Sequence, residues 1–181
     1  AGFLEQEIVD GVSIYVSMSP IDMACLLLKN VFKVKDYDSF ALKLKQLFGR
    51  YLGDAKCAAD ALKIAYPNIN TSQTALALNR AGYPKGQIAM WLMYHTPQVK
   101  DNIVAAVLGS AKDGDIGFTS ADAARVLYSR GYELPDAVTW LIKNNYTLKE
   151  LFVSLVNHYD SAPADVVIAL KPYYNIDQLV E

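Results

Sequence analysis

The amino-acid sequence predicts a compact all-α protein of about nine to eleven short helices. Apolar residues recur at helical spacing along most of the chain, and one stretch of sequence returns in a second copy. In addition, 52% of the 181 residues are hydrophobic, which is enough for one good core. This length favours a single domain over 1–181, with a lead-in and a central helix in 1–35 and stacked helical units in 36–181.

The segment 12–18 departs from the helical pattern. Val12, Ile14 and Val16 alternate there with polar or amphipathic residues after Gly11, which is the period-two pattern of a strand. Because no second strand is evident, such a strand would leave its backbone unpaired and would pair with another chain. The alternative is an extended lead-in or the end of a first helix.

Helix signals follow in order from Ser19. Ser19 and Pro20 are a capping residue and a first-turn proline, and the helix that they begin, from Met23 to Phe32, is apolar nearly all round and therefore expected to be central. One-sided apolar stripes predict helices at 38–51 and after the capping box Thr147–Glu150. Further short helices are predicted at 54–65, 71–81, 84–95, 97–109, 119–130, 134–144 and 162–172.

A duplicated helical hairpin is predicted at about 82–108 and 131–157. The sequence GYPKGQIAMWL begins at Gly82, and GYELPDAVTWL begins forty-nine residues later at Gly131. In this register Trp91 matches Trp140. A period of this size is typical of helical units that cannot bury their apolar faces alone and stack on their neighbours.

Tyrosines concentrate at the predicted helix ends. There a ring can cover the apolar junction between consecutive units while its hydroxyl reaches water. The alternative is an aromatic-lined groove for a peptide or a sugar. The tyrosines concerned are Tyr51, Tyr66, Tyr83, Tyr94, Tyr132, Tyr146, Tyr159, Tyr173 and Tyr174.

The first hairpin resembles the spacing of helix-turn-helix DNA-binding units, with Ala89 as the small residue between the helices. The resemblance implies that Gln98, Lys100 and Asn102 face the nucleic acid, together with Lys85. Where such units usually have glycine in the turn, the two copies have Met93 and Ile142. Nucleic-acid binding is therefore the alternative function.

The loop at 113–122 resembles a degenerate calcium loop. Asp113, Asp115 and Asp122 could supply carboxylate ligands, but Ile116 stands where glycine is expected. The other interpretation is an ordinary loop in which Asp115, Thr119 or Ser120 begins the next helix.

The remaining patterns offer little for catalysis. His95 and His158 lie far apart at predicted helix ends, and Cys25 and Cys57 are expected to be buried free thiols. No cofactor motif is present, so an enzyme would need a site assembled from distant residues. No apolar run reaches the length of a membrane span, which favours a soluble protein. The compartment is only weakly constrained, in favour of the cytoplasm, and stays unknown from the sequence.

The charge distribution suggests where a partner binds. The net charge is −2, yet residues 1–28 contain acidic residues and no Lys or Arg, whereas 29–63 contain eight basic residues against four acidic ones. We therefore expect a non-enzymatic protein-binding or assembly module, with possible self-association. Contact is predicted through Val12, Ile14 and Val16 together with Lys43 and Arg50.

Overall fold

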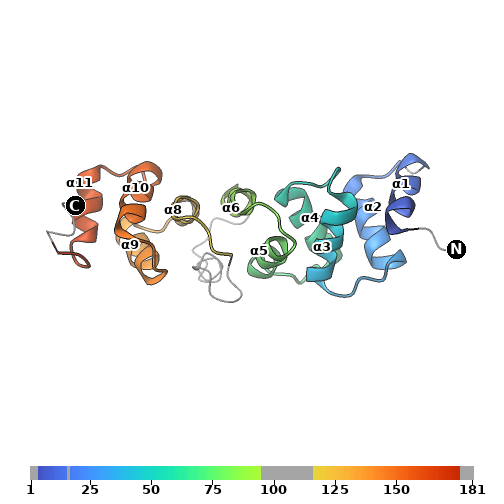
Figure 1. The fold of residues 1–181 in the computed structure, drawn as a ribbon, viewed down its shortest axis with the longest axis horizontal. Coiled ribbons are helices and arrows are strands. Elements are labelled where there is room, and N and C mark those ends of the chain that lie inside the picture. The colour runs from blue at the N-terminus through green and yellow to red at the C-terminus, as the bar shows by residue number, and fades with distance from the viewer. Residues whose placement is uncertain (1–3, 16, 95–115, 176–181) are drawn as a thin grey trace. The chain divides into compact units, whose positions relative to one another are not determined.

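The computed structural model describes residues 4–15, 17–94 and 116–175. Within these ranges the chain is all-helical, as predicted, and has no strand (Figure 1). Its elements are α1 (Glu5–Tyr15), α2 (Pro20–Leu26), the π-helical segment η1 (Leu27–Val31), α3 (Tyr37–Phe48), α4 (Ala55–Ala65), α5 (Thr71–Arg80), α6 (Lys85–Tyr94), α8 (Ser120–Ser129), α9 (Leu134–Lys143), α10 (Leu148–His158) and α11 (Pro163–Leu170). The chain divides into two compact units, Ala1–Trp91 and Leu92–Glu181. The predicted single domain stays a prediction.

The possible strand at 12–18 does not form as far as Tyr15, because these residues belong to helix α1, and the alternative, the end of a first helix, is confirmed there. Val9 is fully buried, Val12 is half-buried one turn later, and Ile14 and Tyr15 are exposed. The spacing of Val9 and Val12 is that of one helix face, and α1 packs with it on α3. The alternating pattern arose because valines and isoleucines lie on both sides of a helix that is only partly covered.

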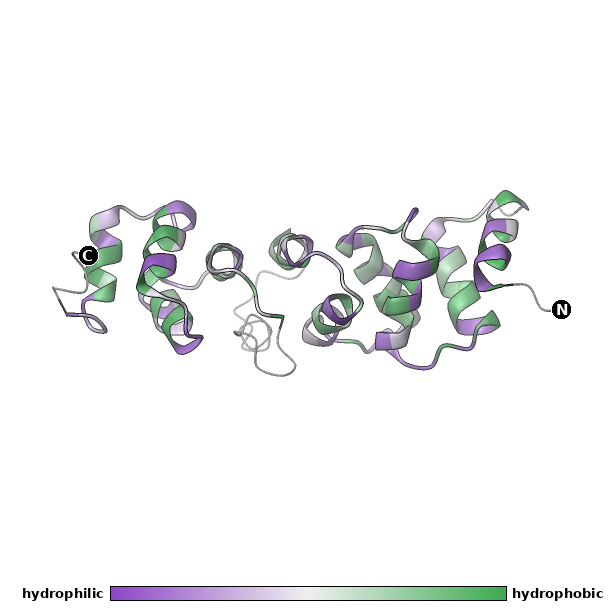
Figure 2. Ribbon diagram, viewed as in Figure 1, coloured by the Kyte–Doolittle hydropathy of each residue, from purple (hydrophilic) through white to green (hydrophobic). Residues whose placement is uncertain are grey.

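In the N-terminal unit the helices from α1 to α5 pack on the next helix but one. Such contacts join α1 to α3, α2 to α4, and α3 to α5, and α2, α3 and α4 also contact the helix that follows each of them (Figure 1). Figure 2 shows the hydrophobic side of these helices turned toward one another. Fully buried side chains of the core include Leu28, Phe40, Leu44, Phe48, Leu62 and Leu78.

Side-chain caps fix where these helices begin. Ser19, Asp36, Asp54 and Asn70 each accept a hydrogen bond from a backbone N–H in the first turn of the following helix. Such caps are each worth about 1 kcal/mol. The boundaries of α2, α3, α4 and α5 are therefore local properties of the sequence.

The C-terminal unit uses the same packing pattern. Helix α8 packs on α10, α9 packs on α11, and sequential neighbours are in contact. Thr119 caps α8, and Thr147 and Glu150 form the predicted capping box of α10. Leu127, Leu141, Leu151 and other apolar side chains of these helices are fully buried.

Three helices end in the same backbone motif. Gly82, Gly131 and Asn145 have φ values of 82°, 69° and 61°, in the left-handed region. The tyrosine that follows each one donates its N–H to a leucine carbonyl five residues earlier, and the Gly or Asn N–H donates to a carbonyl three residues earlier. This pair of bonds is the Schellman motif, for which Gly or Asn is preferred.

The two copies of the predicted duplication correspond in backbone geometry as far as Tyr94 and Lys143. The helices that precede the two copies, α5 and α8, are capped by Asn70 and Thr119, which are also forty-nine residues apart. Gly82 and Gly131 end these two helices in the same way. The tryptophans differ, because Trp91 is buried and Trp140 is partly exposed. The second half of the first copy lies outside the described residues, so duplication stays a prediction.

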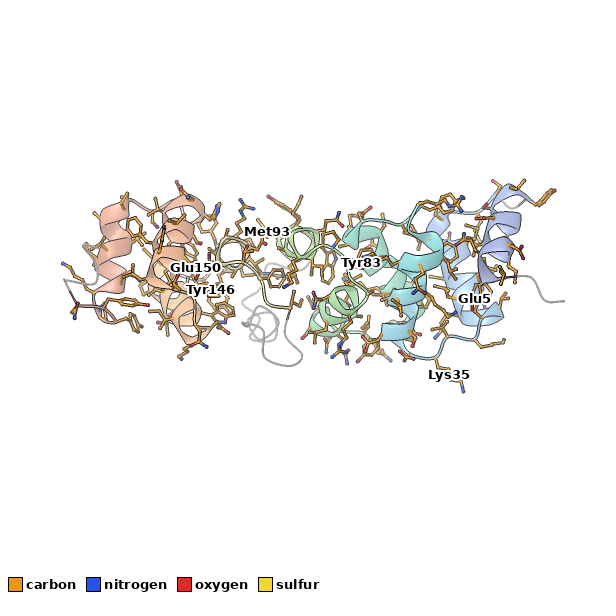
Figure 3. All side chains as sticks on the ribbon, in the orientation of Figure 1. Glu5, Lys35, Tyr83, Met93, Tyr146 and Glu150 are labelled. Atoms are coloured by element: carbon orange, nitrogen blue, oxygen red, sulfur yellow. The ribbon has the colours of Figure 1, made fainter. Side chains whose placement is uncertain are left out.

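Four tyrosines link a helix end to a segment about thirty residues earlier. Each hydroxyl donates to a backbone carbonyl: Tyr66 to Val34 (3.4 Å), Tyr83 to Leu52 (3.4 Å), Tyr146 to Phe118 (2.7 Å) and Tyr159 to Tyr132 (2.8 Å). Tyr83 and Tyr146 are labelled in Figure 3. Each of these hydroxyls therefore joins its helix end to a neighbouring segment of the same unit.

Candidate functional site

Of the residues predicted to contact a partner, Lys43 and Arg50 form ion pairs within the N-terminal unit. Val12 and Ile14 lie on α1, and Val16 lies outside the described residues. Lys43 on α3 pairs with Glu5, and Arg50 pairs with Asp10 at 2.9 Å. The acidic start of the chain and part of the basic stretch that follows therefore neutralise each other and dock α1 on α3.

Three other basic side chains between 29 and 63 also have intramolecular partners. Lys45 donates to the carbonyl of Gly82, Lys56 pairs with Asp60 on the next turn of α4, and Lys63 lies 5.5 Å from the ring centroid of Trp91. The remaining three basic residues of this stretch, Lys29, Lys33 and Lys35, have no ion pair with another described residue. We call these three the lysine rim.

A pocket of about 340 Å³ lies beside the lysine rim. It forms where three helix ends meet, at the beginning of α3, the end of α4 and the beginning of α5, and these three helices pack on one another. This volume lies within the range of sites that accept a small ligand or one large side chain. The pocket, which we call the Tyr66 pocket, is lined by Tyr37, Ala65, Tyr66, Pro67, Asn68, Ile69 and Gln73.

The sequence places these lining residues through caps and a turn. Asp36 caps α3 and so makes Tyr37 its first residue. Pro67 directly follows the C-cap of α4, where a proline stops a helix, and the N–H of Ile69 closes a turn onto the carbonyl of Tyr66. Gln73 accepts the backbone N–H of the cap residue of α5, which fixes its side chain at the pocket wall.

Tyr66 is held on several sides. Its ring meets the rings of Tyr37 and Phe40 edge-on, with centroids 6.3 Å and 5.6 Å apart. Lys29 Nζ lies 4.0 Å from the Tyr66 centroid, within the range of a cation–π interaction. Burial, with a smaller effect of Asp36, raises the pKa of Tyr66 to about 12, so the phenol is neutral. The phenol in the pocket wall is therefore uncharged.

The backbone beside the pocket has two unusual features. The segment η1 is π-helical, and Phe32 donates its N–H to the carbonyl of Leu27, five residues earlier. Lys33 then has a φ of 56°, which is uncommon for a residue with a side chain. Buried Val34 holds this conformation through a bond from its N–H to Leu28. Both features occur often at functional sites.

The lysine rim is connected to the pocket through Tyr66 and Tyr37. Lys33 and Lys35 flank Val34, whose carbonyl accepts the hydroxyl of Tyr66, and Lys35 precedes the pocket residue Tyr37 by two positions. Two residues of extended chain span about 7 Å at most. Both side chains are exposed, and Figure 3 shows Lys35 extending away from the helices.

Two acidic residues also lie near the pocket. The carboxylate of Asp36 is held by the backbone N–H and the side chain of Ser39, which lower its pKa. Asp38 is paired with Arg80 at 2.7 Å. The rim therefore carries three lysines against the single carboxylate of Asp36, and its net charge is positive.

The residues of the helix-turn-helix alternative are only partly described. Lys85 is exposed at the beginning of α6, while Gln98, Lys100 and Asn102 lie outside the described residues. In the second copy, the turn between α9 and α10 places its positive φ at Asn145, three residues beyond Ile142. The exposed side of α10 holds Lys149, Glu150, Val153 and Asn157. The charges of Lys149 and Glu150 cancel, so this side has no net charge.

Of the predicted calcium ligands, only Asp122 is described, and Asp113 and Asp115 lie outside these ranges. One carboxylate oxygen of Asp122 accepts the hydroxyl of Thr119 at 2.9 Å, and the other is 3.9 Å from Arg125. Thr119 begins α8, as the ordinary-loop interpretation expected. No group of three metal-ligating side chains occurs in the part of the chain that the structure describes.

The described histidine and the two cysteines are poorly suited to catalysis. His95 lies outside the described residues, and Nδ1 of His158 accepts from Arg125 Nε at 3.4 Å. Burial and the charge of Arg125 lower the pKa of His158. Both thiols are free, and burial raises the pKa of Cys25 to about 11 and that of Cys57 in the same direction.

Comparison of the chain with family models, with curated proteins and with solved structures finds no match. None of the helices in the described ranges combines the length and hydropathy needed to cross a bilayer.

Sequence reasoning found part of the candidate site. It selected Tyr66 as a helix-end tyrosine and included the rim lysines in the basic stretch. It missed Tyr37, Asn68 and Gln73, because their meeting depends on how α3, α4 and α5 pack. The available signal was the close spacing of a helix-end tyrosine (Tyr66), a helix-stopping proline (Pro67) and a helix-capping asparagine (Asn70).

Proposed function

We propose that this protein is a non-enzymatic protein-binding module whose stacked short helices present the Tyr66 pocket as the contact site. The observation that carries the proposal is the pocket itself, a largely apolar, solvent-open pocket of about 340 Å³ near Lys29, Lys33 and Lys35, which have no ion pair with another described residue. Binding energy between proteins concentrates in such places, where one large side chain is desolvated.

The chemistry of the wall favours a side chain of a protein over a phosphate. Tyrosine, alanine, proline and isoleucine side chains contribute five of the seven lining residues, and no cationic residue is among them. Phosphate groups bind through Arg, Lys and clustered N–H donors. Asn68 and Gln73 supply the few polar groups that orient a bound segment.

A selection from a random peptide library tests the proposal. Purified protein is used to select peptides, and their affinities are measured by fluorescence anisotropy. We expect enriched peptides that bind the wild type and lose at least about tenfold in affinity on Ala65→Phe, which fills the pocket. Ala121→Phe on α8 is the matched control, because Ala121 is also a half-buried helical alanine.

Two results would refute the proposal. The first is the absence of enriched peptides from a library that enriches a known binding domain in parallel. The second is that Ala65→Phe and Ala121→Phe, both verified as folded by circular dichroism, bind as the wild type does. Retention on duplex DNA that falls steeply with salt, without any peptide binding, would instead favour the nucleic-acid alternative.

A further inference from the structure

We infer that the partner segment is an acidic peptide that places one aromatic or branched aliphatic side chain in the Tyr66 pocket and its carboxylates against the lysine rim. This inference rests on the proposed function and adds the chemistry of the partner. It follows from the size and wall of the pocket and from the state of the lysines beside it.

The pocket determines the anchor residue. Its volume of about 340 Å³ is at the small end for ligand sites, so it accepts one side chain rather than a folded element. The rings of Tyr37 and Tyr66 stand edge to face at an interplanar angle of 88°, and a third ring or a branched side chain can pack against such walls.

The lysine rim determines the charge of the flanking residues. Elsewhere in this unit Lys43, Arg50, Lys56 and Arg80 each pair with a carboxylate. The three rim lysines have no such partner within the described residues. Unpaired charge of one sign around an apolar pocket attracts and orients a segment of the opposite sign.

The backbone keeps the rim lysines beside the pocket. Val34 lies between the two exposed lysines, and its N–H bond to Leu28 and the hydroxyl of Tyr66 on its carbonyl hold this part of the backbone, including the left-handed φ of Lys33. A rim that is already ordered loses little backbone entropy when a peptide binds. Asp36 opposes carboxylates, which predicts that the peptide's charges lie toward Lys33 and Lys35.

The experiment uses three fluorescein-labelled peptides of twelve residues with one central tryptophan. The tryptophan is flanked by glutamates in the first, by glutamines in the second and by lysines in the third. Binding to the full chain is measured by anisotropy at 50, 150 and 500 mM NaCl. We expect the glutamate peptide to bind tightest and to weaken as salt rises, because salt screens exposed charges.

Variants then test the rim itself. The double substitution of Lys33→Gln and Lys35→Gln is expected to weaken the glutamate peptide by about 2- to 30-fold, the range for two exposed ion pairs. The glutamine peptide should be unaffected by it. Lys143→Gln with Lys149→Gln removes the same charge from two exposed lysines of the other unit and should change neither affinity.

The outcomes separate this inference from the proposed function. If the three peptides bind the wild type with equal affinity, and Ala65→Phe abolishes the binding of all three, then the pocket binds peptides but the preference for an acidic partner is refuted. If the glutamate peptide binds equally well with alanine in place of tryptophan, the anchor is refuted. If no peptide binds, both proposals fall.

Discussion

Removing the phenolic hydroxyl of Tyr159 should destabilise the C-terminal unit measurably. In Tyr159→Phe the hydrogen bond to the carbonyl of Tyr132, at 2.8 Å, is lost while the ring remains. Tyr159 is 5% exposed, so water replaces the hydroxyl poorly, and burial raises the pKa of this group well above its usual value. The carbonyl would lose a partner that lies 27 residues away in sequence.

The magnitude follows from that geometry. A buried neutral hydrogen bond contributes about 0.5–1.5 kcal/mol, and a carbonyl left unsatisfied costs about 1–3 kcal/mol. Because the carbonyl of Tyr132 lies near the surface and can recover part of its hydration, we expect a loss of about 1–2 kcal/mol. For a unit of this size, each kcal/mol lowers the melting temperature by about 4–8 °C.

The assay is urea unfolding of the full chain, followed by circular dichroism and by tryptophan fluorescence. Tyr128→Phe is the control, because the rings of Tyr128 and Tyr159 pack together with centroids 5.2 Å apart, while Tyr128 is 49% exposed. The control should change the free energy of unfolding by less than about 0.5 kcal/mol. Equal effects of the two substitutions would refute the assigned role of the Tyr159 hydroxyl.

Three further perturbations are expected to have defined effects. Gly131→Ala should lower the free energy of unfolding in urea by about 1–2 kcal/mol, because alanine resists the φ of 69° at this position. Gly11→Ala inside α1 should instead slow amide hydrogen exchange in that helix about 2- to 5-fold. Effects of the opposite sign in these two measurements would contradict the reasoning. Because the pKa of His158 is lowered in the folded protein, protonation of His158 favours the unfolded chain, and the free energy of unfolding should fall from pH 7 to pH 5.5. In His158→Gln it should fall less over the same pH range. Parallel pH profiles of the wild type and this variant would refute the contact of His158 with Arg125. At pH 8, Cys25 should react with iodoacetamide about 100-fold more slowly than a free thiol because its pKa is about 11, and a rate unchanged by urea would contradict its burial.

Helix boundaries were largely predictable because their causes are local. Ser19 with Pro20, and Thr147 with Glu150, carry the chemistry that begins a helix, and the structure places caps at these residues. The positive φ of Gly82 and Gly131 follows equally from sequence, since glycine accepts that conformation. The sequence left 12–18 open between a strand and the end of a first helix, because the burial that decides between them depends on α3, which covers one side of α1.

The candidate site was less predictable. Lys43 and Lys35 belong to the same basic stretch, and nothing in the sequence distinguishes them. Folding brings Glu5 against Lys43 and leaves Lys35 exposed without a carboxylate. A charge pattern therefore predicts that opposite charges will meet, but whether they meet within the chain or across an interface depends on packing.

The sequence by itself determined the all-helical class, most helix starts and the left-handed turns, because these follow from interactions within a few residues of one another. The tertiary structure decided which tyrosine hydroxyls find a carbonyl, which lysines keep an unpaired charge, and that Tyr37, Tyr66 and Gln73 border one pocket. These outcomes require segments about thirty residues apart to lie side by side. Packing of these helices on the next helix but one, and on their sequential neighbours, brings them together.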